Sequence, residues 1–380
     1  MKIKRQFYLD WLRIIVIASL IPYHASLTYT KIGDVYLYDH NISPPNFLIG
    51  FNVFFSTWMM PLLFFISGMV CWYILNSKNT SRFISERASR LLIPAIFGII
   101  TICPLTAYFK AINDFGFKGS LIKFYPVFFT RIMDYLGWAH LWFLVYLFVF
   151  SLLSLPFFIY YKSFKQDNLR KKVGSFFIRN NFIYLPVILV IIFEASLRYK
   201  WPGFQNLIDD WANFSVYITF FIIGYIFNSN TKIIEKIENK KMHSLVMALV
   251  SSVLIVALYF LSDVFNILDS GTFYGYIIFR ALIGFNSYMW VMFFIGFGKK
   301  ALNKTNKMLV YLSEASFPFY ILHLFSVTAF SFIFLKLSLN PYLEFFLVSI
   351  LSFISTLLIY EILLGHYGLR LFFGLKVKKQ

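Results

Sequence analysis

The residues of this sequence best suited to chemistry begin with Arg13 and His24, which bound the mostly apolar run RIIVIASLIPYH. In a helix, eleven residues make about three full turns, so both side chains share one face with a rise of about 16 Å between them. An imidazole titrates near neutral pH and can act as a general base. The spacing equally allows a structural interpretation, in which Arg13 pairs with Asp10 and a backbone carbonyl near Pro22 satisfies His24.

Arg87 and Arg90 form a second candidate group, in the segment SERASRLLIP at the start of a later apolar run. Residues three apart project from the same side of a helix, and two neighbouring guanidiniums suit a phosphate group, which accepts forked hydrogen bonds. Composition alone favours ordinary positive charge at the cytoplasmic end of a membrane span. Both interpretations stay open at this point.

Other ionisable groups lie inside apolar runs, where each costs a few kcal/mol and usually faces a partner, a cavity or a pathway. Glu194 and Arg198 are four residues apart and can neutralise each other on one helix face. Arg280 has no local partner and should face the interior of a bundle. His140 follows Trp138, and it either contacts a hydroxyl-bearing substrate or caps a helix at the membrane surface. We expect the substrate to contact members of this set: His140, Trp142, Arg280, Glu314 and His323.

Composition indicates which elements must position these groups. Of the 380 residues, 59% are hydrophobic and 14% are charged, whereas soluble domains are about 45–50% apolar and about 25% charged. The sequence therefore predicts an all-α integral membrane protein, folded as a polytopic helix bundle. Ten apolar runs are suited to crossing a bilayer as helices, and they cover approximately residues 9–30, 47–75, 91–109, 138–161, 181–199, 214–228, 244–262, 274–298, 312–334 and 342–364.

The distribution of basic residues predicts the orientation of the helices. Twenty-five of the 35 Lys and Arg residues lie in six segments that share one side of the membrane, and eight lie on the other side. This asymmetry predicts about ten transmembrane helices with the N- and C-termini in the cytoplasm. We expect one membrane-embedded domain over residues 1–380 in the plasma or inner membrane, without an appended soluble domain. The net charge of +18 then suits the lipid bilayer, and no nucleic-acid-binding motif is present.

The motifs of common soluble enzymes are absent from the sequence. It contains no phosphate-binding glycine loop, no HExxH, no GxSxG and no paired CxxC. Cys71 and Cys103 lie in apolar runs, where we expect packing residues and no disulfide. We therefore expect no metal, and any chemistry should use the intramembrane groups named above. The oligomeric state is left open.

Five segments taken in order, FYLDWLRIIVIASLIPYH, MMPLLFFISGM, RASRLLIP, HLWFLVYLF and SFPFYILH, resemble the acyltransferase-3 family of bacterial membrane enzymes. The resemblance covers nearly the whole chain and is greatest to the branch of that family that contains glucan biosynthesis protein C, a succinyltransferase. The family has about ten spans and a cytoplasmic N-terminus. It carries an Arg-x10-His pattern in the first span, here Arg13 and His24, and an Arg-x-x-Arg pattern at the third, here Arg87 and Arg90.

The resemblance implies transfer of an acyl group from cytoplasmic acyl-CoA to a hydroxyl of an extracytoplasmic or lipid-linked glycan, with acetyl as the favoured group and succinyl as the alternative. It implies that Arg13, Arg87 and Arg90 hold a phosphate of CoA. His24 would act as the general base, with Arg13 and Asp10 completing the catalytic group, and a transient acyl-enzyme is the variant mechanism. The alternative function is an exporter or flippase of a glycan or lipid-linked precursor.

Overall fold

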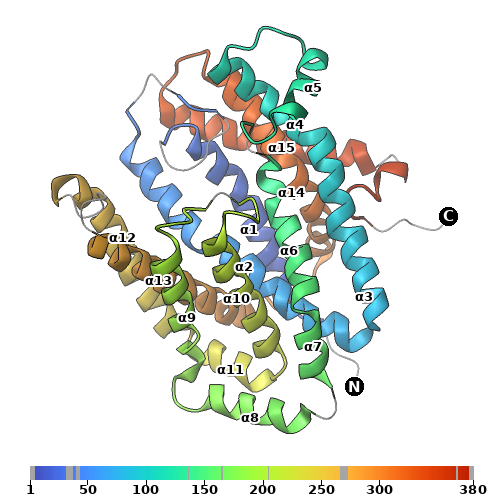
Figure 1. Cartoon of the computed structure of the whole chain (residues 1–380), viewed down its shortest axis with the longest axis vertical. Coiled ribbons are helices and arrows are strands. Elements are labelled where there is room, and N and C mark those ends of the chain that lie inside the picture. Colours follow the sequence, from blue (N-terminus) through green and yellow to red (C-terminus); the bar gives the residue numbers. More distant parts are fainter. Residues whose placement is uncertain are drawn as a thin grey trace. The chain divides into compact units, whose positions relative to one another are not determined.

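The computed structural model describes residues 5–30, 37–39, 43–135, 137–163, 166–203, 205–265, 273–364 and 367–375 of the chain. Every regular element among these residues is a helix (Figure 1), which confirms the predicted all-α class. Apolar segments fold this way in lipid because a helix satisfies its backbone N–H and C=O groups internally. The first four and last five residues of the chain lie outside the described ranges, so the side on which each terminus lies stays a prediction.

The α-helices described in Figure 1 follow one another with short connections. They are α1 (Phe7–Leu27), α2 (Asn46–Ser77), α3 (Thr80–Arg87), α4 (Ile93–Phe115), α5 (Leu121–Thr130), α6 (Trp142–Leu153), α7 (Leu155–Lys162), α8 (Asp167–Ile178), α9 (Val187–Leu197), α10 (Trp211–Asn228), α11 (Thr231–Asn239), α12 (Lys241–Phe265), α13 (Phe273–Ala301), α14 (Lys307–Phe334) and α15 (Pro341–Leu364). Shorter segments are the π-helix η1 (Ala88–Leu92) and the 3-10 helices η2 (Ala139–Leu141), η4 (Phe182–Tyr184) and η5 (Tyr367–Leu369).

The chain divides into two compact units. The first unit contains Met1–Arg13, Phe54–Ile84 and Val149–Thr305, and the second contains Ile14–Val53, Ser85–Phe148 and Asn306–Gln380. In the first unit, α13 packs against α9, α11 and α12. In the second unit, α14 packs against α4 and α15, and η2 packs against α4 and α14. The candidate residues of the second unit therefore surround α14.

Seven of the described helices are long and apolar enough to cross a membrane, and the number rises to nine if each of two bent pairs forms one span. The first bent pair, 139–162, turns by 49°, next to Pro156, which lacks a backbone donor. The second turns by 101° between α8 and Phe182–Leu197, so only its second part matches the predicted span 181–199. These nine match nine of the ten predicted runs. The tenth is α1, which carries Asp10 and Arg13, and the predicted total of ten stays a prediction.

Two glycines allow α2 and α10 to approach closely inside the first unit. A Cβ atom on Gly68 would lie 1.9 Å from the carbonyl oxygen of Phe221, and one on Gly224 would lie 2.1 Å from that of Phe65. Both contacts would be with backbone atoms, which cannot move aside as a side chain can. This crossing therefore requires small residues, as close helix packing in membranes often does.

We expect Gly224→Ala to lower the free energy of unfolding by about 1–3 kcal/mol, because α2 and α10 must separate to admit the methyl group. The measurement is denaturant unfolding of the purified protein in detergent. Gly50→Ala is the matched control on α2, since a Cβ atom there meets nothing within 4 Å. Equal stability of the Gly224→Ala variant and the unmodified protein would contradict the close crossing.

Candidate functional site

Three histidines from separate elements meet in the second unit. His24 comes from α1, His140 from η2 and His323 from α14. The ring centroids of His24 and His323 are 5.3 Å apart, and those of His140 and His323 are 4.9 Å apart. His323 is fully buried and His140 is 6% exposed. The structure thus brings together three of the candidates that were separated by more than a hundred residues in the sequence.

Hydrogen bonds between η2 and α14 hold this histidine cluster (His24, His140 and His323) in place. Nε2 of His140 lies 3.0 Å from the carbonyl oxygen of Ile321, and the hydroxyl of Tyr320 donates to the carbonyl oxygen of His140. Ala139 has a φ of 55°, which is uncommon for a residue other than glycine and is a form of strain that clusters at functional sites. The chain therefore adopts an unfavourable backbone conformation where it positions His140.

Backbone carbonyls fix the tautomers of two of the three rings. Nδ1 of His323 lies 2.7 Å from the carbonyl oxygen of Tyr320. Because a carbonyl can only accept, Nδ1 carries the hydrogen and Nε2 keeps a lone pair in the neutral ring. By the same reasoning the hydrogen of His140 is on Nε2, next to Ile321, and its lone pair is on Nδ1.

Each histidine of the cluster keeps one buried ring nitrogen that has no hydrogen-bond partner among the described residues. These atoms are Nδ1 of His24, Nδ1 of His140 and Nε2 of His323. Buried polar atoms in proteins are nearly always paired, so three such atoms in one cluster need a particular reason. The nitrogens of His140 and His323 are lone pairs by the argument above. The cluster is therefore equipped to accept a hydrogen bond or a proton from a hydroxyl group.

α1 carries both Arg13 and His24, so the predicted helical spacing of this pair is confirmed. Arg13 donates to Asp10 at 3.2 Å, and Arg5 donates to the other carboxylate oxygen of Asp10 at 2.8 Å. The predicted pairing of Arg13 with Asp10 is thereby confirmed. The structural interpretation of His24 expected a backbone carbonyl, but its Nδ1 has no such partner among the described residues.

Arg87 and Arg90 lie where α3 passes into the π-helix η1. Arg87 is the last residue of α3 and is half-buried, while Arg90 is exposed inside η1. π-helices are rare and often occur at functional sites. Their wider turns change the directions of side chains, so the α-helical geometry predicted for this pair does not apply unchanged. Gly374, with a φ of +63°, lies against this turn, since a Cβ atom there would be 3.4 Å from the carbonyl oxygen of Arg90.

Two other candidates of the second unit have contacts that the sequence did not predict. Glu314 accepts a hydrogen bond from Arg370 at 2.6 Å, and the side chain of Arg370 is 9% exposed. Trp142 is 7% exposed, and its ring packs edge-on against Tyr146 with 5.3 Å between centroids. Both contacts account for these residues structurally, and their predicted role in substrate binding stays a prediction.

The last candidate, Arg280, belongs to a buried ion network in the first unit. Glu194 accepts hydrogen bonds from Arg198 at 2.6 Å and from Arg280 at 2.8 Å. The predicted pairing of Glu194 with Arg198 is therefore confirmed, and α13 supplies the partner for Arg280 that its own neighbours lack. Arg198 also donates to the side-chain oxygen of Asn213 at 2.7 Å.

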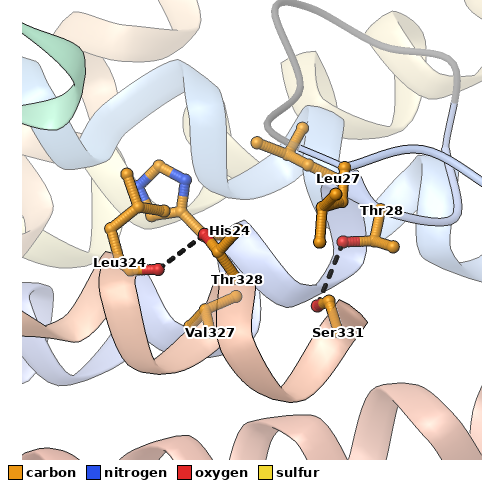
Figure 2. Close-up of a pocket in the computed structure, with 8 residues that line it drawn as sticks. His24, Leu27, Thr28, Leu324, Val327, Thr328 and Ser331 are labelled. Carbon is orange, nitrogen blue, oxygen red and sulfur yellow. Dashed lines mark hydrogen bonds between the residues drawn. The ribbon is translucent and has the colours of Figure 1, made fainter. Parts of the chain in front are cut away.

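A small cavity lies beside His24, between the end of α1 and the second half of α14 (Figure 2). Its volume of about 10 Å³ is room for about one water-sized group. Figure 2 shows the α1 side facing the α14 side, with the hydroxyl of Thr28 bonded to that of Ser331 at 3.3 Å. The complete lining is His24, Leu27, Thr28, Leu37, Leu324, Val327, Thr328 and Ser331.

Sequence analysis did not identify the hydroxyl residues of this cavity. A signal was present, because 324, 327, 328 and 331 follow the i, i+3, i+4, i+7 spacing of one helix face. The same face continues from His323, but nothing in the sequence showed that it meets α1.

Cys71 and Cys103 are free and buried, as predicted. Among the described residues, no three or more His, Cys, Asp or Glu side chains are arranged to hold a metal ion. The histidine cluster is therefore best considered as a site for acid–base chemistry.

Comparison with known proteins identifies the family. A model described as an acyltransferase domain matches residues 6–361. Similar curated proteins include the glucans biosynthesis protein C of Salmonella paratyphi B, of Salmonella dublin and of Salmonella gallinarum, each 22% identical over 227 residues. The match covers 58% of this chain and 57% of each relative, so it spans little more than half the length of these proteins. No solved structure matches the chain significantly. Because the domain model covers nearly the whole chain, this protein belongs to the acyltransferase-3 family.

Proposed function

We propose that this protein is a multi-pass O-acyltransferase of the cell membrane, which transfers an acyl group from cytoplasmic acyl-CoA to a hydroxyl of an extracytoplasmic or lipid-linked glycan. The observation that carries this proposal is the histidine cluster, with its three buried ring nitrogens open to a hydroxyl hydrogen. Membership of an acyltransferase family supports the reaction class. Acetyl is the favoured acyl group, and succinyl is the alternative.

His24 acts as the general base in this proposal. As the acceptor hydroxyl attacks the thioester carbonyl carbon, its proton moves to His24, the carbon–sulfur bond breaks, and His24 returns the proton to the sulfur of CoA. The products are an O-acyl ester and free CoA, and the imidazole ends in its starting state. His323 packs against His24, and its Nδ1 hydrogen is held by Tyr320, so it acts as a positioning residue for the base. In the variant mechanism, the protein carries the acyl group transiently before the acceptor receives it.

The donor binds from the cytoplasmic side, where loop charge places the N-terminus. Arg13, Arg87 and Arg90 supply guanidinium groups for the phosphates of CoA. From Arg13 to His24 the helix rises by about 16 Å, which is comparable with the pantetheine arm. A thioester at the end of that arm then reaches the base while the nucleotide stays at the cytoplasmic end of α1.

The test is the release of free CoA by the purified protein, given acetyl-CoA or succinyl-CoA together with a glycan acceptor. Mass spectrometry of the acceptor should show the mass of one acyl group added. Consumption of neither thioester, combined with movement of glycan across vesicles that contain the protein, would replace this proposal with the exporter alternative.

We expect Arg87→Ala to raise the KM for acyl-CoA by about 10- to 100-fold with a smaller change in kcat, because hydrogen bonds to charged groups contribute about 1.5–3 kcal/mol. Initial rates over a range of acyl-CoA concentrations give both constants. Arg87→Lys should recover only part of the affinity, since it keeps the charge without the forked donors. Arg82→Ala on the same helix is the matched control for loss of one positive charge. An unchanged KM in the Arg87→Ala variant would count against phosphate binding at this residue.

A further inference from the structure

The cavity beside His24 is bounded mainly by aliphatic side chains. Leu27 and Leu37 contribute from the segments around the end of α1, and Leu324 and Val327 contribute from α14 (Figure 2). Val327 is 2% exposed and Leu324 is 1% exposed. A group that enters this space from the side of His24 therefore meets a rigid apolar wall.

The polar atoms of the cavity are largely committed to bonds within the protein. The hydroxyl of Thr328 donates to the carbonyl oxygen of Leu324 at 2.7 Å, and the hydroxyl of Thr28 donates to Ser331 at 3.3 Å. None of the eight lining residues is an acid, a lysine or an arginine. An anionic group would thus be desolvated here without a charged partner in the lining, which is costly.

The charged residues described next to the end of α1 are acidic. The backbone N–H of Asp39 donates to the carbonyl oxygen of Thr28 at 3.0 Å, which ties Asp39 to the wall of the cavity. Asp39 and Glu344 both interact electrostatically with Tyr29, the next residue along the chain. Negative charge beside the cavity further disfavours a carboxylate inside it.

The size of the cavity limits the group that it can hold. About 10 Å³ is room for one water-sized or methyl-sized group. Each methylene beyond the space available to a bound substrate changes selectivity by about 10- to 200-fold. A longer acyl chain would have to displace Leu27 or Val327.

We propose that this cavity holds the acyl group of the donor while His24 serves the acceptor hydroxyl, and that it restricts the acyl group to a short, uncharged one, of which acetyl is the best fit. The proposal rests on the acyltransferase function proposed above. It assigns specificity to Leu27 and Val327 by size, and to the uncharged lining with Asp39 nearby by charge. Succinyl, which is longer and carries a carboxylate, is excluded on both grounds.

The test compares kcat/KM for acetyl-CoA, propionyl-CoA and succinyl-CoA. The unmodified protein should prefer acetyl over propionyl by about 10-fold or more and over succinyl by about 100-fold or more. Val327→Ala should raise the ratio of propionyl to acetyl use by about 10-fold, because it removes two methyl groups from the wall, and it should leave succinyl use low. Ile333→Ala is the matched control, since Ile333 is on the same helix and 51% exposed.

The two proposals fail in different ways. Use of succinyl-CoA as efficiently as acetyl-CoA, or an unchanged propionyl ratio in a folded Val327→Ala variant, would overturn the assignment of the cavity while leaving acyl transfer intact. Release of CoA from none of the three donors would overturn the proposed function itself. The ranking of donors by the unmodified protein needs no variant, so the assignment stays testable if Val327→Ala does not fold.

Discussion

The His24→Ala variant is expected to release CoA from acyl-CoA about 10²- to 10⁴-fold more slowly than the unmodified protein, with little change in its affinity for CoA. Loss of a positioned general base has this magnitude. The reason is local: His24 is the member of the histidine cluster that lines the cavity proposed for the acyl group, and its Nδ1 is buried without a partner among the described residues. No other lining residue of that cavity titrates near neutral pH.

The measurement is the initial rate of CoA release at saturating acyl-CoA, together with direct CoA binding and thermal unfolding of each variant. His243→Ala is the matched control, because His243 is exposed on α12 in the first unit. We expect both variants to bind CoA and to unfold like the unmodified protein. Full turnover by the His24→Ala variant would remove His24 from the mechanism.

The sequence predicted the interactions that depend on helical spacing alone. The pairs Arg13 with Asp10 and Glu194 with Arg198 are three and four residues apart, and both are present. Such pairs follow from helix geometry as soon as the segment is known to be helical. The apolar runs were long enough to establish that, because only helices bury so many consecutive backbone groups in lipid.

Interactions between separate helices could not be predicted in this way. Arg280 reaches Glu194 across 86 residues, and Arg370 reaches Glu314 across 56. Periodicity shows which residues share a face of one helix, but it does not say which faces meet. For the same reason, His24 and His323 were separate candidates in the sequence, and only the packing of α1 and α14 made them neighbours.

Local backbone geometry was the other feature beyond the reach of the sequence. The segment of Arg90 is π-helical, although its residues would equally suit an α-helix. Ala139 adopts a positive φ that glycine would adopt more easily. In both places the surrounding contacts determine the conformation, so residue preferences gave no warning.

The ion network of Glu194 leads to the second large expected effect, which is on stability. Glu194 and Arg198 are 5% and 6% exposed, and Glu194 bonds to both Arg198 and Arg280. Gly203, with a φ of +124°, allows the backbone to approach, since a Cβ atom there would lie 3.0 Å from a guanidinium nitrogen of Arg198. The network therefore joins α9, α13 and the connection before α10 through one carboxylate.

We expect Glu194→Ala to lower the free energy of unfolding by about 3–5 kcal/mol, because it leaves buried positive charge without its carboxylate. Glu194→Gln should lose less, since its amide oxygen can still accept one hydrogen bond. Denaturant unfolding in detergent measures both changes, and Glu235→Ala on the exposed side of α11 is the matched control. If Glu194→Ala unfolds at the same denaturant concentration as Glu235→Ala, the network does not stabilise the first unit. Because the network is in the first unit and the histidine cluster is in the second, the folded fraction of the Glu194→Ala variant should still bind CoA, which separates this effect from that of His24→Ala.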